Sequence, residues 1–309
     1  MAGIVAVSTS SFGKENAAPL ELVRAAGFEV RMNPHGRTLT TDEAKAHLDG
    51  VVGLIAGTEK LTGDLLRGLP SLKAISRVGV GMDGVDQVAA KELGIAVSNT
   101  PSAHVDAVAE LTLAGLMAIL RQVPASDASI RSGGFTKPMG RLLRGQTVGL
   151  VGFGQVAQAF AALLAPFNCT LLAYDVMPNA AAAATLGVTL TTLERVVADA
   201  DIVSIHVPYS KSAHNLIAAP QLTMMKRDGI LLNAARGGLV DEAALLAHLQ
   251  ANSKAGAYLD CFEKEPYSGP LATLPNVVLT AHIGSYAREA RLRMETEAAQ
   301  NLLRSLGQA

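Results

Sequence analysis

Short apolar runs alternate with longer amphipathic segments in the first hundred residues. Residues 19–26 are predicted to form a helix that ends before Gly27, and Thr40-Thr41-Asp42-Glu43 has the form of a capping box at the start of another helix. Strand-like runs lie around these helices, at residues 4–8, 28–32, 51–56, 74–78 and 95–98. Such alternation predicts right-handed βαβ units around a parallel sheet.

A second series of strand-like runs begins at residue 147. Before it we expect an apolar helix at Val105–Leu120 and a basic, glycine-rich exposed loop at residues 131–145. The series is long enough for a complete dinucleotide-binding sheet, with runs at residues 147–151, 170–174, 202–207, 230–233, 257–259 and 277–280. A last amphipathic helix at residues 287–306 is expected to pack back on the first unit.

These patterns predict an α/β protein of two domains, each a doubly wound parallel sheet of the Rossmann or flavodoxin type. Residues 1–99 with 286–309 are predicted to form the first domain, and residues 100–285 are predicted to form a second domain inserted within it.

A glycine-rich turn joins the first strand and the first helix of the second series. Gly152-Phe153-Gly154-Gln155-Val156-Ala157 has the G-x-G-x-x-A form, in which the glycines allow a tight turn and close approach of a pyrophosphate. Asp175 ends the next strand, where a carboxylate bonds the ribose 2′-hydroxyl and repels a 2′-phosphate. In this order the two features predict NAD rather than NADP, although Asp175 could also simply cap a turn.

Three polar residues each follow a strand-like run: Arg236, Glu265 and His282. The carboxyl ends of parallel strands line one crevice, so we expect these side chains to converge. An arginine can hold a carboxylate with two bonds, and a histidine beside a carboxylate can move a proton near neutral pH. The structural alternatives are a helix-cap cation for Arg236, a backbone-bonded strand-end residue for His282 and a solvated loop residue for Glu265.

The composition indicates a folded protein with a large core. Hydrophobic residues make up 49% and charged residues 17%, and the formal net charge of −1 gives no reason to expect nucleic acid or an anionic membrane as a partner. We find no secretory signal and no apolar stretch of the about 20 residues that span a bilayer. We expect a soluble cytoplasmic protein in which Cys169 and Cys261 are reduced, and we predict no metal site.

Motifs spread over essentially the whole chain resemble those of the D-isomer-specific 2-hydroxyacid dehydrogenases. Besides residues 152–157 they are Arg77-Val78-Gly79-Val80-Gly81-Met82-Asp83, Asn99-Thr100-Pro101, Val108-Ala109-Glu110-Leu111, His206-Val207-Pro208, Asn233-Ala234-Ala235-Arg236-Gly237-Gly238, Asp260-Cys261-Phe262-Glu263-Lys264-Glu265-Pro266 and Ala281-His282-Ile283-Gly284. Within the family, residues 234–242 are most similar to D-3-phosphoglycerate dehydrogenases.

The resemblance implies a reaction and a role for each domain and motif. Residues 1–99 with 286–309 would be the substrate-binding domain and residues 100–285 the NAD-binding domain. The active site would lie in the cleft between them, with hinge closure that excludes water before hydride transfer. Arg236 would bind the carboxylate of a 2-oxo acid and polarise its carbonyl, His282 would exchange a proton with the carbonyl oxygen, and Glu265 would pair with His282. Asp260 would bond the nicotinamide carboxamide, and Pro208 would pack near the adenine. The substrate carboxylate would also meet the backbone of Val78, Gly79, Val80 and Gly81. NAD would contact Gly152, Gly154, Gln155, Val156, Asp175, His206, Pro208, Ala234, Asp260 and Gly284.

The substrate stays open at this stage. Phosphoglycerate dehydrogenases usually carry an Arg-Ser pair after the strand at residues 51–56, where it helps bind the phosphate, whereas this chain has Gly57-Thr58-Glu59-Lys60. Lys60, residues 8–11, or a basic residue in 131–144 of a partner subunit are candidate replacements. The first candidate activity is that of a 3-phosphoglycerate dehydrogenase, and the alternative is reduction of glyoxylate, hydroxypyruvate or another 2-oxo acid. No C-terminal regulatory domain, and so no feedback inhibition by serine, is expected.

Functions outside this activity also remain open. A non-catalytic NAD-sensing regulatory protein could keep the same residues. Formate dehydrogenase shares the fold but typically pairs its histidine with Gln, so Glu265 counts against it, and Asp175 counts against the NADPH that glyoxylate/hydroxypyruvate reductases usually prefer. The helix at Val105–Leu120 has more apolar surface than a lone domain edge should expose, which predicts a homodimer through the NAD-binding domain.

Overall fold

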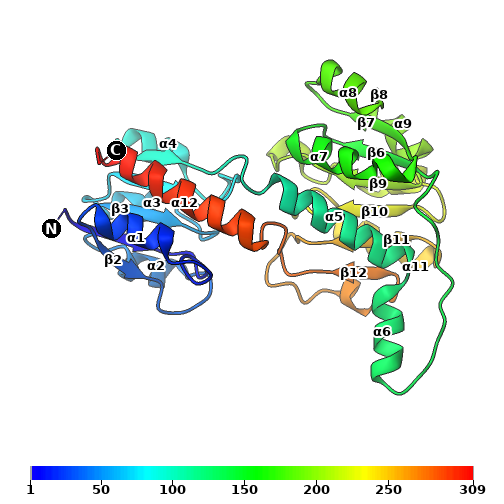
Figure 1. Ribbon diagram of the computed structural model, residues 1–309, viewed down its shortest axis with the longest axis horizontal. Coiled ribbons are helices and arrows are strands. Elements are labelled where there is room, and N and C mark those ends of the chain that lie inside the picture. Colours follow the sequence, from blue (N-terminus) through cyan, green and yellow to red (C-terminus); the bar gives the residue numbers. More distant parts are fainter. Residues whose placement is uncertain (1, 309) are drawn as a thin grey trace. The chain divides into compact units, whose positions relative to one another are not determined.

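The computed structural model describes residues 2–308, which form two compact units (Figure 1). Unit 1 contains the described residues up to His104 together with those from Ser285 onward, and unit 2 is Val105–Gly284. The sequence placed the corresponding boundaries at residues 99/100 and 285/286. The roles predicted for the two units remain predictions.

Unit 1 is built on a five-stranded parallel sheet in the order β2-β1-β3-β4-β5. Its strands are β1 (Ile4–Val7), β2 (Glu29–Met32), β3 (Gly53–Ala56), β4 (Ala74–Arg77) and β5 (Ala96–Ser98). Its helices are α1 (Ala18–Ala25), α2 (Thr41–His47), α3 (Gly63–Arg67), α4 (Gln87–Glu92) and α12 (Arg288–Ser305). The strand order reverses between β1 and β3, and ligands of such sheets bind at the carboxyl ends of the strands at this point.

Local signals fix the ends of several elements of unit 1. The predicted capping box is present, because the Thr40 hydroxyl accepts the N–H of Glu43 and the Glu43 carboxylate accepts the N–H of Thr40. The last helix, α12, packs against α1, β3, β4 and β5, as predicted. Its Met294 and Leu302 are buried in one core cluster with Ile55. The chain therefore leaves unit 1, forms unit 2 and returns.

Unit 2 contains a seven-stranded parallel sheet in the order β12-β11-β10-β9-β6-β7-β8. Its strands are β6 (Thr147–Val151), β7 (Thr170–Tyr174), β8 (Val188–Leu190), β9 (Ile202–Ile205), β10 (Ile230–Asn233), β11 (Gly256–Leu259) and β12 (Val277–Leu279). Its helices are α5 (Val105–Leu120), α6 (Val123–Arg131), α7 (Gln155–Leu164), α8 (Ala180–Leu186), α9 (Leu193–Asp199), α10 (Ala219–Met224) and α11 (Glu242–Ala251). The predicted fold class, two parallel α/β sheets, is confirmed, whereas α6 and β8 were not anticipated.

The apolar helix α5 is a core element of unit 2. It packs against α7, β10, β11 and β12, and a Cβ on Gly115 would stand 2.4 Å from the ring of the buried Tyr258. No single helix within residues 2–308 is long and apolar enough to cross a membrane, although α5 and α6, bent by 64° at their break, pass that test as a pair. Residues 132–146 form neither helix nor strand, so the predicted loop is confirmed except at Arg131, which ends α6.

Candidate active site

Three neighbouring strands of unit 2 end next to the predicted catalytic residues. β10, β11 and β12 are adjacent in the sheet, and the chain beyond their carboxyl ends carries Arg236, Glu265 and His282. Glu265 and His282 are in direct contact, and the charge of Arg236 acts on Glu265. The three side chains therefore lie at one edge of one sheet.

His282 and Glu265 form a hydrogen-bonded pair. Nδ1 of His282 lies 3.0 Å from each carboxylate oxygen of Glu265, and both side chains are 38% exposed. Burial by itself would raise the pKa of Glu265, but the hydrogen bond and charge of His282, the N–H of Phe262 and the charge of Arg236 outweigh it, so the pKa is lowered. The ionised carboxylate fixes Nδ1 as a donor, which leaves Nε2 for a reacting group.

The buried carboxylate of Asp260 holds the chain on both sides of His282. It accepts hydrogen bonds from the Thr280 hydroxyl at 2.5 Å and from the backbone N–H groups of Ile283 at 2.8 Å and Gly284 at 2.7 Å. His282 itself has a φ of +54°, a left-handed conformation that costs free energy in a residue with a side chain. Asp260 therefore supports the loop, and its predicted contact with the nicotinamide remains a prediction.

The turn that carries Arg236 is organised by the buried Asn233. The Asn233 side chain accepts the N–H of Ala235 at 3.1 Å and donates to the carbonyl of Arg236 at 2.8 Å. Gly237 then lies against the turn after β11, because a Cβ on Gly237 would stand only 1.9 Å from the carbonyl oxygen of Phe262. The missing side chain at this position is what allows the two turns to touch.

The glycine-rich turn between β6 and α7 has the geometry that a pyrophosphate needs. Gly152 has a φ of +91°, and a Cβ there would stand 2.8 Å from the backbone of His206. A Cβ on Gly154 would meet open space, and within residues 2–308 the N–H groups of Gly154, Gln155 and Val156 have no hydrogen-bond partner. Open space beside donors at a helix N-terminus fits a bound phosphate group, so the residues present fit NAD.

Asp175 lies directly after β7, next to this glycine-rich turn. Its carboxylate accepts the N–H of Phe153 at 2.6 Å and the N–H of Met177 at 2.8 Å. An ionised carboxylate has about four acceptor positions, so these bonds leave room for a ribose hydroxyl. The bond to the ribose remains a prediction.

The remaining predicted cofactor residues follow the carboxyl ends of other strands of the sheet. His206 and Pro208 come after β9, Ala234 after β10, and Gly284 beyond β12. The His206 ring is hydrogen-bonded to Ser204 at 2.8 Å, and burial lowers the pKa of His206 to about 4. The ring is therefore neutral near pH 7, which suits contact with an uncharged base.

The loop of unit 1 that was predicted to bind a carboxylate follows β4. Gly79 has a φ of +137° and donates its N–H to the Thr100 hydroxyl at 2.8 Å, and a Cβ on Gly79 would stand 2.2 Å from the Arg77 guanidinium. The N–H groups of Val80 and Gly81 have no partner among residues 2–308. Adjacent backbone donors of this kind suit an anion.

Three polar residues that shape the site had no predicted role: Asn233, Thr280 and Glu242. The first two make the hydrogen bonds given above. Glu242, at the start of α11, accepts the N–H of Glu263 at 2.8 Å and so ties α11 to the turn that leads to Glu265. Burial raises the pKa of Glu242. Their only signal in the sequence is that they lie within or beside the quoted motifs.

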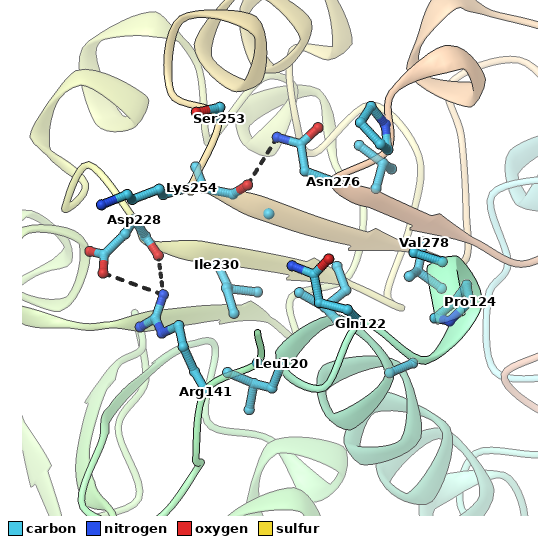
Figure 2. Close-up of a pocket in the computed structure, with 18 of the residues that line it drawn as sticks. Leu120, Gln122, Pro124, Arg141, Asp228, Ile230, Ser253, Lys254, Asn276 and Val278 are labelled. Atoms are coloured by element: carbon cyan, nitrogen blue, oxygen red, sulfur yellow. Dashed lines mark hydrogen bonds and ion pairs between the residues drawn. The ribbon is translucent and has the colours of Figure 1, made fainter. Parts of the chain in front are cut away.

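A separate cavity of about 440 Å³ lies at the opposite edge of the sheet of unit 2 (Figure 2). Its lining includes Ile230, Gly256 and Val277, the first residues of β10, β11 and β12. Arg141 and Asp228 pair on one side of it, with a nitrogen–oxygen distance of 3.5 Å. None of the predicted site residues lines this cavity. Within residues 2–308 no group of His, Cys, Asp and Glu is arranged to hold a metal ion.

The fold and the site together define a dinucleotide-binding α/β protein with a histidine–carboxylate pair at the carboxyl edge of its sheet. Residues 113–284 match the family model of the NAD-binding domain of D-isomer specific 2-hydroxyacid dehydrogenases. The chain belongs to this family. It is therefore an NAD-dependent oxidoreductase that acts on small D-2-hydroxy or 2-oxo acids, which confirms the predicted class and cofactor.

Similar proteins with different names lie in this family. The chain is 37% identical over 271 residues to a glyoxylate reductase of Thermococcus litoralis, with 84% of this chain and 81% of the relative covered. It is 38% identical over 252 residues to a D-3-phosphoglycerate dehydrogenase of Mycobacterium bovis, covering 81% of this chain but 48% of the relative, so it spans about half of that protein. The crystal structure of the TT0316 protein of Thermus thermophilus superposes with a TM-score of 0.90 at 36% identity, covering 98% of this chain and 97% of that protein.

Proposed function

We propose that His282 is the acid–base residue for hydride transfer at C2 of a small D-2-hydroxy acid. In reduction its Nε2 donates a proton to the carbonyl oxygen, and in oxidation Nε2 accepts the proton of the hydroxyl. Glu265 keeps Nδ1 protonated and stabilises the imidazolium. The observation that carries this proposal is the 3.0 Å contact of Nδ1 with both carboxylate oxygens. When bound, NAD supplies the hydride acceptor or donor.

The substrate carboxylate is bound from two sides in this proposal. Arg236, after β10, offers the planar donor pair that matches a carboxylate and polarises the neighbouring carbonyl. The N–H groups of Val80 and Gly81 in unit 1 supply further donors, supported by their lack of a partner among the described residues. In this proposal unit 1 is the substrate-binding domain and unit 2 is the NAD-binding domain.

The cofactor is held by the carboxyl edge of unit 2 in this proposal. The N–H groups of Gly154, Gln155 and Val156 hold the pyrophosphate, and Asp175 bonds the ribose and disfavours a 2′-phosphate. The neutral ring of His206 and the exposed Pro208 lie toward the adenine. Ala234, Asp260 and Gly284 contact the nicotinamide end of the cofactor in this proposal.

Two substrate groups have support among the relatives. The first group is 3-phosphoglycerate, which is in the name of one set of similar proteins. The second group is glyoxylate and hydroxypyruvate, which are in the names of other similar proteins. The test is NADH oxidation by the purified protein with a panel of 2-oxo acids that includes glyoxylate, hydroxypyruvate and 3-phosphohydroxypyruvate, the oxo form of 3-phosphoglycerate. Turnover with at least one acid is expected. NADH binding without turnover of any acid would overturn the enzymatic mechanism and favour an NAD-sensing regulatory protein.

We also propose a homodimer through unit 2. Helix α6 and the loop after it project from the rest of unit 2 (Figure 1). Five large apolar side chains in this segment are more than half exposed: Val123, Ile130, Phe135, Met139 and Leu142. A second copy of unit 2 would cover them. Light scattering should give about twice the chain mass of 32.0 kDa, and a monomer at micromolar concentration would refute the dimer.

The free thiols Cys169 and Cys261 support a cytoplasmic location.

A further inference from the structure

A buried carboxylate lies beneath the turn after β3 in unit 1. Glu59 is 4% exposed, and its carboxylate accepts hydrogen bonds from the Ser8 hydroxyl and from the N–H of Gly57, the latter at 3.1 and 3.3 Å. Ser8 follows β1 and Gly57 follows β3. One internal carboxylate therefore occupies donors from both strand ends.

These strand ends are where a ligand of unit 1 would bind. The order of the sheet reverses between β1 and β3, and in open α/β sheets the ligand crevice lies outside the carboxyl ends of the strands at that point. The loop that contains Val80 and Gly81 follows β4, which is the neighbour of β3, so it lies along the same edge. A substrate whose carboxylate meets this loop has its far end near the turns after β1 and β3.

Two arginines near this edge, the buried Arg291 and the half-buried Arg77, each act on a carboxylate of unit 1. Arg291 of α12 is 8% exposed, and its Nη2 donates to Glu295 at 2.8 Å and to the Ser11 hydroxyl, in the loop after β1, at 2.6 Å. Burial raises the pKa of Glu59, and the charge of Arg77, at the end of β4, works against that rise. Each of these two arginines therefore already has a carboxylate of unit 1 near it.

Exposed and half-buried hydroxyls line these turns, beside the exposed Lys14 and Lys60. Thr38 and Thr58 are exposed and lie 3.3 Å apart between their oxygens, and Thr9 is half-buried with its hydroxyl 3.3 Å from that of Ser11. Hydroxyls both donate and accept, so they bond a neutral hydroxyl group as well as water does. A phosphate would instead require donors and positive charge that compensate for its loss of hydration.

From this arrangement we infer that the enzyme selects 2-oxo and 2-hydroxy acids with an uncharged far end, a hydrogen or a hydroxymethyl group, and discriminates against a phosphate at that position. The inference rests on the proposed function, because it assumes that unit 1 binds the far end of the substrate. Glu59 is the residue that sets the preference, by occupying the Ser8 and Gly57 donors and by placing a carboxylate below the turn. The exposed Lys60, next in the chain, is the competing feature, since a lysine can bind phosphate as a point charge.

The test compares kcat/KM for glyoxylate, hydroxypyruvate and 3-phosphohydroxypyruvate with NADH and the wild-type protein. Hydroxypyruvate and its phosphate ester differ only at the far end, so their ratio isolates the preference. We expect hydroxypyruvate to be favoured by at least about tenfold. A phosphate ester that is equally good or better would overturn the inference while leaving the proposed function intact. Failure of all three acids would instead contradict the proposed function.

Two variants and a control assign the preference to residues. Glu59→Gln should raise the ratio of phosphorylated to unphosphorylated kcat/KM by about tenfold, because an amide has one acceptor oxygen and cannot occupy the Ser8 and Gly57 donors as the carboxylate does. Glu29→Gln makes the same substitution at an exposed residue at the amino end of β2 and should leave the ratio unchanged. The ratio is taken within each variant, so a partial loss of folded protein cancels. An unchanged ratio in Glu59→Gln, or a wild-type preference for phosphate that disappears in Lys60→Ala, would overturn the inference.

Discussion

The Asp260→Asn substitution tests whether a buried carboxylate positions His282. In the wild-type protein one oxygen of Asp260 accepts the Thr280 hydroxyl and the Ile283 N–H, and the other accepts the Gly284 N–H. Asparagine keeps one oxygen and puts an amide NH2 in place of the other. The orientation that preserves two bonds points this NH2 at the N–H of Gly284, so a buried donor loses its acceptor.

The size of the effect follows from these contacts. A buried N–H that loses its partner costs about 1–3 kcal/mol, so the free energy of unfolding should fall by about that amount. His282 has a φ of +54°. When Asp260 no longer makes all three hydrogen bonds on either side of His282, the backbone there can relax toward a more favourable conformation. A displacement of the imidazole by about 1 Å would lower kcat by about 100-fold.

Three measurements separate the roles of Asp260. Steady-state NADH oxidation gives kcat, fluorescence titration gives the Kd of NADH, and urea unfolding gives the stability. Asp241→Asn is the matched control, because Asp241 also accepts two backbone N–H groups, at the start of α11, where asparagine is an equally good cap. A kcat of Asp260→Asn within about twofold of wild type would refute the positioning role. A higher Kd with unchanged kcat would support the nicotinamide contact alone.

Three further substitutions have defined outcomes. Gly237→Ala puts a Cβ 1.9 Å from the carbonyl oxygen of Phe262 and should lower the free energy of urea unfolding by about 1–3 kcal/mol; unchanged stability would mean that the two turns separate freely. The pKa of Glu265 is lowered on folding, so its contribution to stability is present above the unfolded pKa of about 4.3 and is lost as the pH falls through the folded pKa. In Glu265→Gln the free energy of unfolding should therefore fall less steeply than in the wild type as the pH drops below about 4.3. An equally steep fall would contradict the pairing of Glu265 with His282. Asp175→Asn should raise the kcat/KM for NADPH relative to NADH by about tenfold, and no change would remove Asp175 from the cofactor site.

Much of the fold could be predicted because each buried strand is a short apolar run bounded by polar or glycine residues. The strands that begin at Thr147, Thr170 and Ile230 have the predicted bounds. Helix α6 escaped prediction because it buries no residue: Val123 and Ile130 are 54% and 53% exposed, so no apolar face marks it. Strand β8 has only three residues, too few to show an alternating pattern.

The contacts that position the site could not be predicted, because they depend on register and backbone angles. Leu259 of β11 pairs with Leu279 of β12, which brings Asp260 beside Thr280 and the loop of His282. Neither this register nor the left-handed φ of His282 has a local signal in the sequence. Strand ends predicted which residues share an edge, whereas hydrogen-bond partners required the structure.

The most direct test of the account is the His282→Ala variant, assayed with whichever 2-oxo acid the wild-type protein turns over. Loss of the proton donor should lower kcat by about 10²–10⁴-fold, the usual contribution of general acid–base catalysis, while the Kd of NADH measured by fluorescence stays near the wild-type value. Wild-type turnover in this variant would contradict the assignment of proton transfer to the His282–Glu265 pair.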